Sequence, residues 1–302
     1  MEVLRGISED ELLRERLGFK GGTALSKLHF GGSGRLSVDL DFNVLGSRSE
    51  VQGLRAELRS RLIPVVRYAC PGSRIRHRHS WEMLGVEARY QPVSGSEPQV
   101  LKVELSMVER FPITRTEIYP LDLPSGGRAQ VRSYPVDELV STKLRALFSR
   151  SKGRDLYDLD LARPLLRDPG LVRRMAVYYF YRSRIAYDPE VFAANVAEKL
   201  ASPAFVRDAR PFLRTDTTWD AGLAARRFPE RYSFMSEISA GESGFISRAR
   251  SMLDPSGRGE VTIAADARPL SELFGGLPEV SARALEATVE DIRVWPSRPR
   301  WR

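Results

Sequence analysis

The chain has 302 residues, 42% of them hydrophobic, and its 47 Lys and Arg residues against 39 Asp and Glu give a formal net charge of +8. This length is enough for two domains, and the positive charge suits a polyanionic partner such as a nucleic acid. No apolar run reaches the roughly 18 residues of a membrane helix. Residues 1–19 are charged and lack the apolar core of a secretory signal.

Cys70 is the single cysteine, so an intramolecular disulfide is excluded. It stands in a largely apolar run, and we interpret it as a small buried side chain rather than a nucleophile. Together with the lack of a signal or a membrane segment, this favours a cytoplasmic protein.

In chain order, the first half of the sequence mixes helical and strand periodicities. Helices are predicted at 8–17 (with Ser8 as N-cap), 24–30 and 49–62, strands at 35–44, 84–90, 100–107 and 128–132, a glycine turn at 19–23 and a flexible loop at 31–34. From residue 135 the pattern is mainly helical. Helices are predicted at 135–150, 154–162, 171–187, 189–200, 243–253 and 280–294, and a loose tail at 296–302. We therefore expect a mixed α/β domain over 1–165 and a helical domain over 166–302.

Two aspartates alternate with apolar residues in the strand predicted at 35–44. Successive side chains of a strand point to opposite faces, so Asp39 and Asp41 share one face, about 7 Å apart. Like charges on one face repel each other, and aspartate is rare in strands. An ordinary solvated face is the alternative, but the pair is better explained as a site for two hard cations that also bind phosphate oxygens.

The strand predicted at 100–107 has the same design. Its apolar face is Leu101, Val103, Leu105 and Met107. Its polar face carries Glu104 next to Lys102. If this strand lies beside the first, Glu104 supplies a third carboxylate, and otherwise the two residues form a surface pair. The sequence alone does not choose between these interpretations.

A glycine turn, Gly21 and Gly22 followed by Thr23, precedes a predicted helix. Backbone N–H groups and a hydroxyl at such a place can hold a phosphate. The turn is no P-loop, because the G-x-x-x-x-G-K-[ST] pattern does not occur in the chain. One helix fits between Thr23 and Asp39.

Lys143 interrupts the apolar stripe of the helix predicted at 135–150, four residues after Leu139 and four before Leu147. An unpaired lysine is costly in an apolar setting. Either the side chain reaches past the edge of the stripe into solvent, or it points into an acidic, phosphate-filled cleft where Glu104 or a nucleotide compensates its charge. We favour the second interpretation.

Charged residues also cluster at 150–158, where they are equally compatible with a capped helix on the surface. Further along, the helical half contains many arginines. Arg173, Arg174, Arg182 and Arg184 are predicted to form part of a surface that binds a nucleic-acid backbone.

Taken in order, these segments resemble the signature of the AbiEii/AbiGii family of bacterial toxins, which includes the mycobacterial MenT toxins. The matching segments are KGGTAL at 20–25, RLSVDLDF at 35–42, VEL at 103–105, the DEL…KL pattern at 137–144 and RDLYD at 154–158. They span about half of the chain. The 19 residues before Lys20 are few for this family.

The resemblance implies a polymerase-β-like nucleotidyltransferase fold with a helical C-terminal domain. It implies transfer of a nucleotide from an NTP, in the mycobacterial examples onto tRNA 3′ ends, and a cognate antitoxin. By position, Asp39, Asp41 and Glu104 would bind two Mg²⁺ ions, or Mn²⁺ in their place. Gly21, Gly22, Thr23 and Ser37 would contact the nucleotide phosphates, and Lys143 and Asp155 match positions important for activity.

Three alternatives remain open at this stage. A related enzyme could modify a small molecule, against which the +8 charge argues mildly. A protein could be the acceptor. A third alternative is a non-catalytic nucleic-acid or protein-binding module, which the intact acidic residues disfavour.

Overall fold

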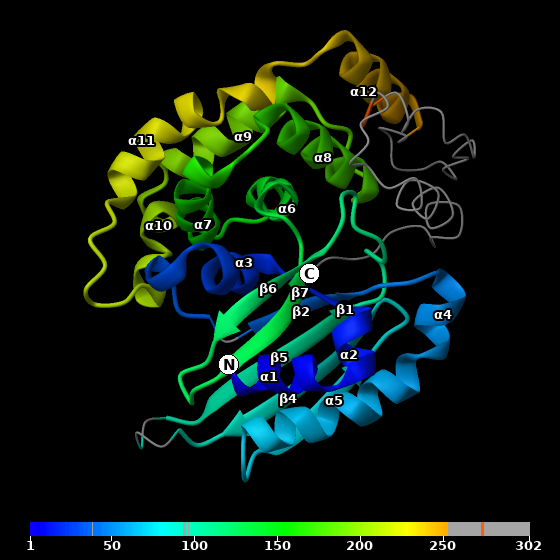
Figure 1. The fold of residues 1–302 in the computed structure, drawn as a ribbon. Coiled ribbons are helices and arrows are strands. Elements are labelled where there is room, and N and C mark those ends of the chain that lie inside the picture. The colour runs from blue at the N-terminus through cyan, green and yellow to red at the C-terminus, as the bar shows by residue number, and fades with distance from the viewer. Residues whose placement is uncertain (38, 93–94, 96, 253–272, 275–302) are drawn as a thin grey trace. The chain divides into compact units, whose positions relative to one another are not determined.

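The computed structural model describes residues 1–37, 39–92, 95, 97–252 and 273–274 (Figure 1). The chain divides into two compact units, Met1–Pro135 and Val136–Arg302. This division comes earlier in the chain than the predicted boundary at residue 165. The reason is local packing, since helices α6 (Val136–Ser149) and α7 (Arg154–Ala162) pack against each other, and α6 also packs on the following helix, α8 (Pro169–Arg182).

A seven-stranded mixed sheet forms the first unit, in the order β3-β4-β5-β2-β1-β7-β6. Its strands are β1 (Leu17–Lys20), β2 (Asp39–Val44), β3 (Arg74–His79), β4 (Met83–Tyr90), β5 (Gln99–Ser106), β6 (Glu117–Asp122) and β7 (Arg128–Ser133). The β1–β7 and β2–β5 pairs are parallel, and all other pairs are antiparallel. The predicted mixed α/β class is confirmed.

The apolar face of this sheet is covered by helices α1 (Glu2–Glu9) and α5 (Arg55–Ala69), which lie on the same side of it (Figure 1). Both helices bury residues at helical spacing. These are Val3, Leu4 and Ile7 of α1 and Leu58, Leu62 and Val66 of α5. From the strands, the rings of Phe19 and Phe42 pack 5.0 Å apart. With this face buried, the alternate residues of the same strands are directed to the opposite face.

Before the sheet, the single helix predicted at 8–17 is two helices, α1 and α2 (Glu11–Arg16). The cap of α2 is Asp10, whose carboxylate accepts a hydrogen bond from the backbone N–H of Leu13 at 3.0 Å. The predicted cap, Ser8, instead donates its hydroxyl to the carbonyl of Arg5. Asp10 thus interrupts what the apolar spacing suggests is one continuous helix.

Several strand predictions also need correction. Strand β1 includes the first two residues of the glycine turn expected at 19–23, and β2 begins at Asp39 instead of residue 35. Leu36, expected on the apolar face, is 56% exposed. The predicted helix at 49–62 is divided into α4 (Arg48–Gly53) and α5. Cys70 is buried, as predicted.

In the first unit, the chain between β1 and β2 forms α3 (Gly21–Ala24), the π-helical turn η1 (Leu25–His29) and the 3₁₀ turn η2 (Gly31–Ser33). The second unit is helical throughout the part that the structure describes. Besides α6, α7 and α8 it contains η3 (Arg163–Leu165), α9 (Pro189–Ala201), α10 (Pro203–Arg207), η4 (Arg210–Phe212), α11 (Ala221–Arg231), η5 (Ser233–Ser236) and α12 (Ala240–Met252). The predicted helix at 280–294 and the tail at 296–302 lie outside the described residues. No helix within the described ranges has the length and apolar character needed to cross a bilayer.

Candidate active site

The carboxylates predicted from the two alternating strands lie side by side in the sheet. Strand β2 pairs in parallel with β5, so that Asp41 is opposite Glu104 and Asp39 is opposite Lys102. Paired residues of neighbouring strands share a face, with their strands about 4.8 Å apart. Asp39, Asp41 and Glu104 therefore form one cluster, which we call the carboxylate face. The interpretation of Glu104 as a neighbour of the aspartates is confirmed in its geometry.

Electrostatics distinguish this cluster from an ordinary polar surface. Partial burial raises the pKa of Glu104, and the negative charges of Asp41 and Asp39 raise it further, against a smaller opposing effect of Lys102. The fold thus holds Asp39 and Asp41 close enough to Glu104 to disfavour the ionisation of Glu104. A divalent cation would relieve this repulsion, and carboxylate oxygens are the ligands that Mg²⁺ prefers.

No group of three or more His, Cys, Asp or Glu side chains in the described part of the chain has the geometry of a preformed metal site. The donor set of the carboxylate face is oxygen only and acidic, which is the chemistry that hard divalent cations such as Mg²⁺ prefer.

The glycine turn lies directly against the carboxylates. Gly21 has a φ of +78°, and a Cβ at this position would be 2.8 Å from Oδ2 of Asp41. Only glycine combines a positive φ with such a close approach. Its neighbour Lys20 pairs across the strands with Asp41 and forms an ion pair with Glu109, with 2.8 Å between Nζ and Oε2. Sequence reasoning missed Glu109, which stands in a segment without a recognisable pattern.

Two hydroxyls connect the glycine turn to the start of β2. The Thr23 hydroxyl donates to the carbonyl of Asp39 at 2.6 Å, and it also shares a hydrogen bond with the hydroxyl of Ser37. Thr23 is almost fully buried. The contacts that the structure gives Thr23 therefore position Asp39, and its predicted contact with a nucleotide phosphate stays a prediction.

In the second unit, Lys143 is the centre of a buried ionic network. Its ammonium lies 3.1 Å from Asp155 and 2.9 Å from Asp158, and the lysine side chain is only 5% exposed. Arg150 donates two further hydrogen bonds, both of 2.8 Å, to the carboxylate of Asp155. The lysine is not at a solvent-exposed edge. The charge of Lys143 is compensated by Asp155 and Asp158 of its own unit, in place of the Glu104 or the nucleotide that the sequence analysis predicts.

The pKa of Asp155 responds to this network. Burial on its own would raise the pKa, but the charges of Lys143 and Arg150 and their hydrogen bonds outweigh burial and hold it well below its usual range. Asp155 is thus kept as a carboxylate by its partners.

The prediction of a basic surface in the helical half is wrong for Arg173. Arg173 is buried and forms a bidentate ion pair with Glu242, with distances of 2.7 and 2.9 Å. Its remaining Nη1 donates to the carbonyl of Phe234. Helix α8 is buried along most of its length, and Arg173 needs an internal partner because its charge is removed from water.

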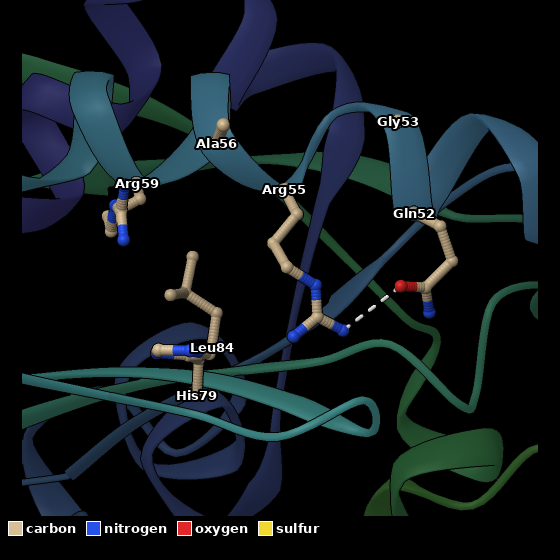
Figure 2. Close-up of a pocket in the computed structure, with 7 residues that line it drawn as sticks. All are labelled: Gln52, Gly53, Arg55, Ala56, Arg59, His79 and Leu84. Carbon is tan, nitrogen blue, oxygen red and sulfur yellow. Dashed lines mark hydrogen bonds between the residues drawn. The ribbon is translucent and has the colours of Figure 1, made fainter.

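A small pocket opens elsewhere in the first unit (Figure 2). Its lining includes Arg55 and Arg59 of α5 with His79 and Leu84 of the hairpin below them. His79 is opposite Leu84 in the β3–β4 pair, and Leu84 is opposite Leu105 of the apolar face. The pocket therefore lies on the helix-covered side of the sheet and is distinct from the carboxylate face.

Comparisons with known proteins identify the family of this chain and structures with a similar fold. A family model described as nucleotidyl transferase AbiEii toxin, type IV TA system, matches residues 2–227. Among solved structures, MenT4, a nucleotidyltransferase toxin from Mycobacterium tuberculosis H37Rv, is similar over 90% of each chain, with a TM-score of 0.64 and 22% identity. JHP933 from Helicobacter pylori matches with a TM-score of 0.43 and 18% identity, over 83% of this chain and 91% of that one. A search of curated proteins finds no match.

Proposed function

Since the chain belongs to the AbiEii family of nucleotidyl transferase toxins, we propose that it transfers a nucleotide from an NTP to the 3′-terminal hydroxyl of a tRNA and releases pyrophosphate. The observation that carries this proposal is the carboxylate face. Asp39, Asp41 and Glu104 gather on neighbouring strands beside a glycine turn that approaches Asp41. The net charge of +8 favours a polyanionic acceptor over a small molecule.

In the proposed reaction the acceptor oxygen forms a bond to the α-phosphorus as the bond from that phosphorus to the bridging oxygen of the β-phosphate breaks. Pyrophosphate leaves with the bonding electron pair, and the hydroxyl proton is released to solvent. Asp39, Asp41 and Glu104 would hold two Mg²⁺ or Mn²⁺ ions. Such ions, when bound, make the attacking hydroxyl more acidic and neutralise charge on the leaving group.

The other site residues would bind and orient the nucleotide. Gly21 and Gly22 would present backbone N–H groups to its phosphates, and Thr23 and Ser37 would fix the turn relative to Asp39. For Lys143 and Asp155, the buried network supports a positioning role over direct contact with phosphate. Membership of a toxin–antitoxin family implies an antitoxin partner, and we place the reaction in the cytoplasm, where NTPs and tRNA are found.

The test is an incubation of the protein with each α-labelled NTP in turn, Mg²⁺ and total RNA, with purified protein and small-molecule fractions as separate acceptors. The proposal expects label in the tRNA fraction, released by nucleases that remove 3′ ends, and no label with Asp41→Asn. Label in a protein or a small molecule would mean that the acceptor is not tRNA, while nucleotide transfer itself would stand. No label in any fraction would leave a binding module as the better account.

A further inference from the structure

The carboxylate face does not end at Glu104 but continues to the edge of the sheet. In register, Glu104 is opposite Gly85 of β4, and Gly85 is opposite Arg78 of β3. One step along the strands, Lys102 is opposite Glu87, which is opposite Arg76. Arg76 and Arg78 thus share a face with Asp39 and Asp41, three strand spacings or about 14 Å away.

This end of the face is positively charged and exposed. Strand β3 is an outer strand of the sheet, and its alternate residues Arg74, Arg76 and Arg78 are all exposed; we call these three the basic edge. Arg89 of β4 and Lys102 of β5 add two exposed cations on the same face. The single acidic residue of β3 and β4, both described in full, is Glu87, which lies 3.7 Å from Arg78.

Protection against aggregation is the simplest alternative explanation of a charged edge strand. For that role the sign of the charge does not matter, nor does the face of the strand that carries it. Here the cations alternate, so they gather on the side that leads to the carboxylates, while Ile75, His77 and His79 occupy the other side. The position of the charge is therefore better explained by a ligand that also reaches the carboxylate face.

The in-line geometry of phosphoryl transfer indicates that this ligand is the acceptor and not the NTP. The attacking and leaving oxygens of a phosphoryl transfer lie on opposite sides of the phosphorus. The glycine turn follows β1, on one side of β2, whereas β5, β4 and β3 lie on the other side. If the departing pyrophosphate is at the glycine turn, as in the proposed function, the acceptor arrives over β5 and β4.

We infer that the basic edge binds the sugar–phosphate backbone of a single-stranded RNA acceptor and guides its 3′ end across β4 and β5 to the carboxylates. The inference rests on the proposed function. Backbone binding by Arg side chains needs no base sequence.

The test compares the unmodified protein with Arg76→Gln/Arg78→Gln. A matched control, Arg59→Gln/Arg67→Gln, removes the same charge from α5 on the opposite side of the sheet. Binding of a fluorescent single-stranded RNA of about 12 nucleotides is followed by anisotropy over a range of salt concentrations. Each phosphate contact to a single strand contributes about 0.7 to the log–log salt slope, so the edge variant should lose about 1.4. Its affinity at low salt should fall at least tenfold, with the control unchanged.

Two further readouts separate the edge from the reaction. The melting-temperature increase caused by the accepted NTP should be the same in both variants, because the glycine turn is unaltered. Transfer of label to RNA should fall in the edge variant alone. If the unmodified protein labels RNA and the edge variant binds and labels it equally well, the inference about the edge is overturned and the proposed function stands. If the unmodified protein neither binds nor labels RNA, both are overturned.

Discussion

Two groups of acidic residues in this chain each contain one carboxyl group with a shifted pKa, and the two shifts have opposite directions. On the carboxylate face, burial and the neighbouring aspartates raise the pKa of Glu104. In the helical unit, Lys143 and Arg150 outweigh burial and lower the pKa of Asp155. In the first group the acidic neighbours of Glu104 affect its pKa more than Lys102 does, whereas in the second group the charge of Asp155 is compensated by Lys143 and Arg150. The difference teaches that a buried carboxylate indicates a ligand site when its near neighbours are also acidic, and a structural role when they are basic.

Removing a carboxylate from the first group should have the largest effect. In Asp41→Asn we expect nucleotide transfer to fall by on the order of 10³-fold or more, since the charge that holds the cations is lost. The fold should survive, and the melting temperature in EDTA should stay or rise because a like-charge repulsion is relieved. Glu87→Gln, on the same face but two strands from β2, is the control and should remain active. Full activity of Asp41→Asn would remove the contrast between the two groups.

Removing the central cation of the second group should mainly affect stability. Lys143→Met leaves Asp155 and Asp158 buried beside each other without the ammonium. Breaking a buried ion pair from one side typically costs about 3–5 kcal/mol. We expect a loss of this size in the free energy of unfolding, measured by urea denaturation, and a partial recovery when Asp158→Asn is added. Lys152→Met, an exposed lysine, should be nearly neutral. If Lys143→Met keeps its stability and loses only NTP turnover, Lys143 contacts the nucleotide phosphates and the positioning role is wrong.

The pH dependence of the free energy of unfolding should reveal the contribution of Asp155 in the second group. Asp155 has a folded-state pKa below its ordinary value of 3.8. Its contribution to stability is therefore fully present above the unfolded value and is lost as the pH falls toward the folded one. Asp155→Asn should be less stable than the unmodified protein at pH 7, and the difference should shrink below about pH 4. A difference that stays constant from neutral to acidic pH would mean that Asp155 contributes by packing alone.

The smallest effect is expected at the glycine turn. Gly21→Ala introduces a residue at φ +78° whose Cβ would displace the carboxylate of Asp41. The left-handed backbone alone costs about 1–2 kcal/mol. Gly72→Ala, with φ +72° and nothing within 4 Å of the added Cβ, incurs the same backbone cost without the displacement. Both variants should lose similar stability, and Gly21→Ala alone should lose activity. Equal activity in the two would mean that the turn does not position Asp41.

The sequence predicts local features of this site better than its long-range contacts. Strict alternation places Asp39 and Asp41 on one face without any structure, because strand geometry is local. That Glu104 is opposite Asp41 depends on β2 pairing with β5, which no local pattern determines. Strands β3 and β6 are not predicted for a different reason, which lies in their own sequences. RIRHRH lacks an apolar face, and β6 contains Pro120, which a central strand would not accommodate.

In the helical unit, the apolar stripe predicts that Lys143 is buried, but its partners on α7 are not identified by the stripe. Arg173 was expected on the surface because arginine is usually exposed. Its partner Glu242 is 69 residues away in the sequence, and only the three-dimensional packing of α8 reveals the pair.

The central claim is that the first group of carboxylates binds divalent cations together with a nucleotide. Its most direct test is the binding of Mn²⁺ followed by electron paramagnetic resonance, with a non-hydrolysable NTP analogue, in the unmodified protein and in Asp39→Asn/Asp41→Asn. We predict a protein-bound Mn²⁺ signal that Mg²⁺ displaces in the unmodified protein, and its loss in the variant while the circular dichroism spectrum is unchanged. Equal Mn²⁺ binding by the two proteins would contradict the account.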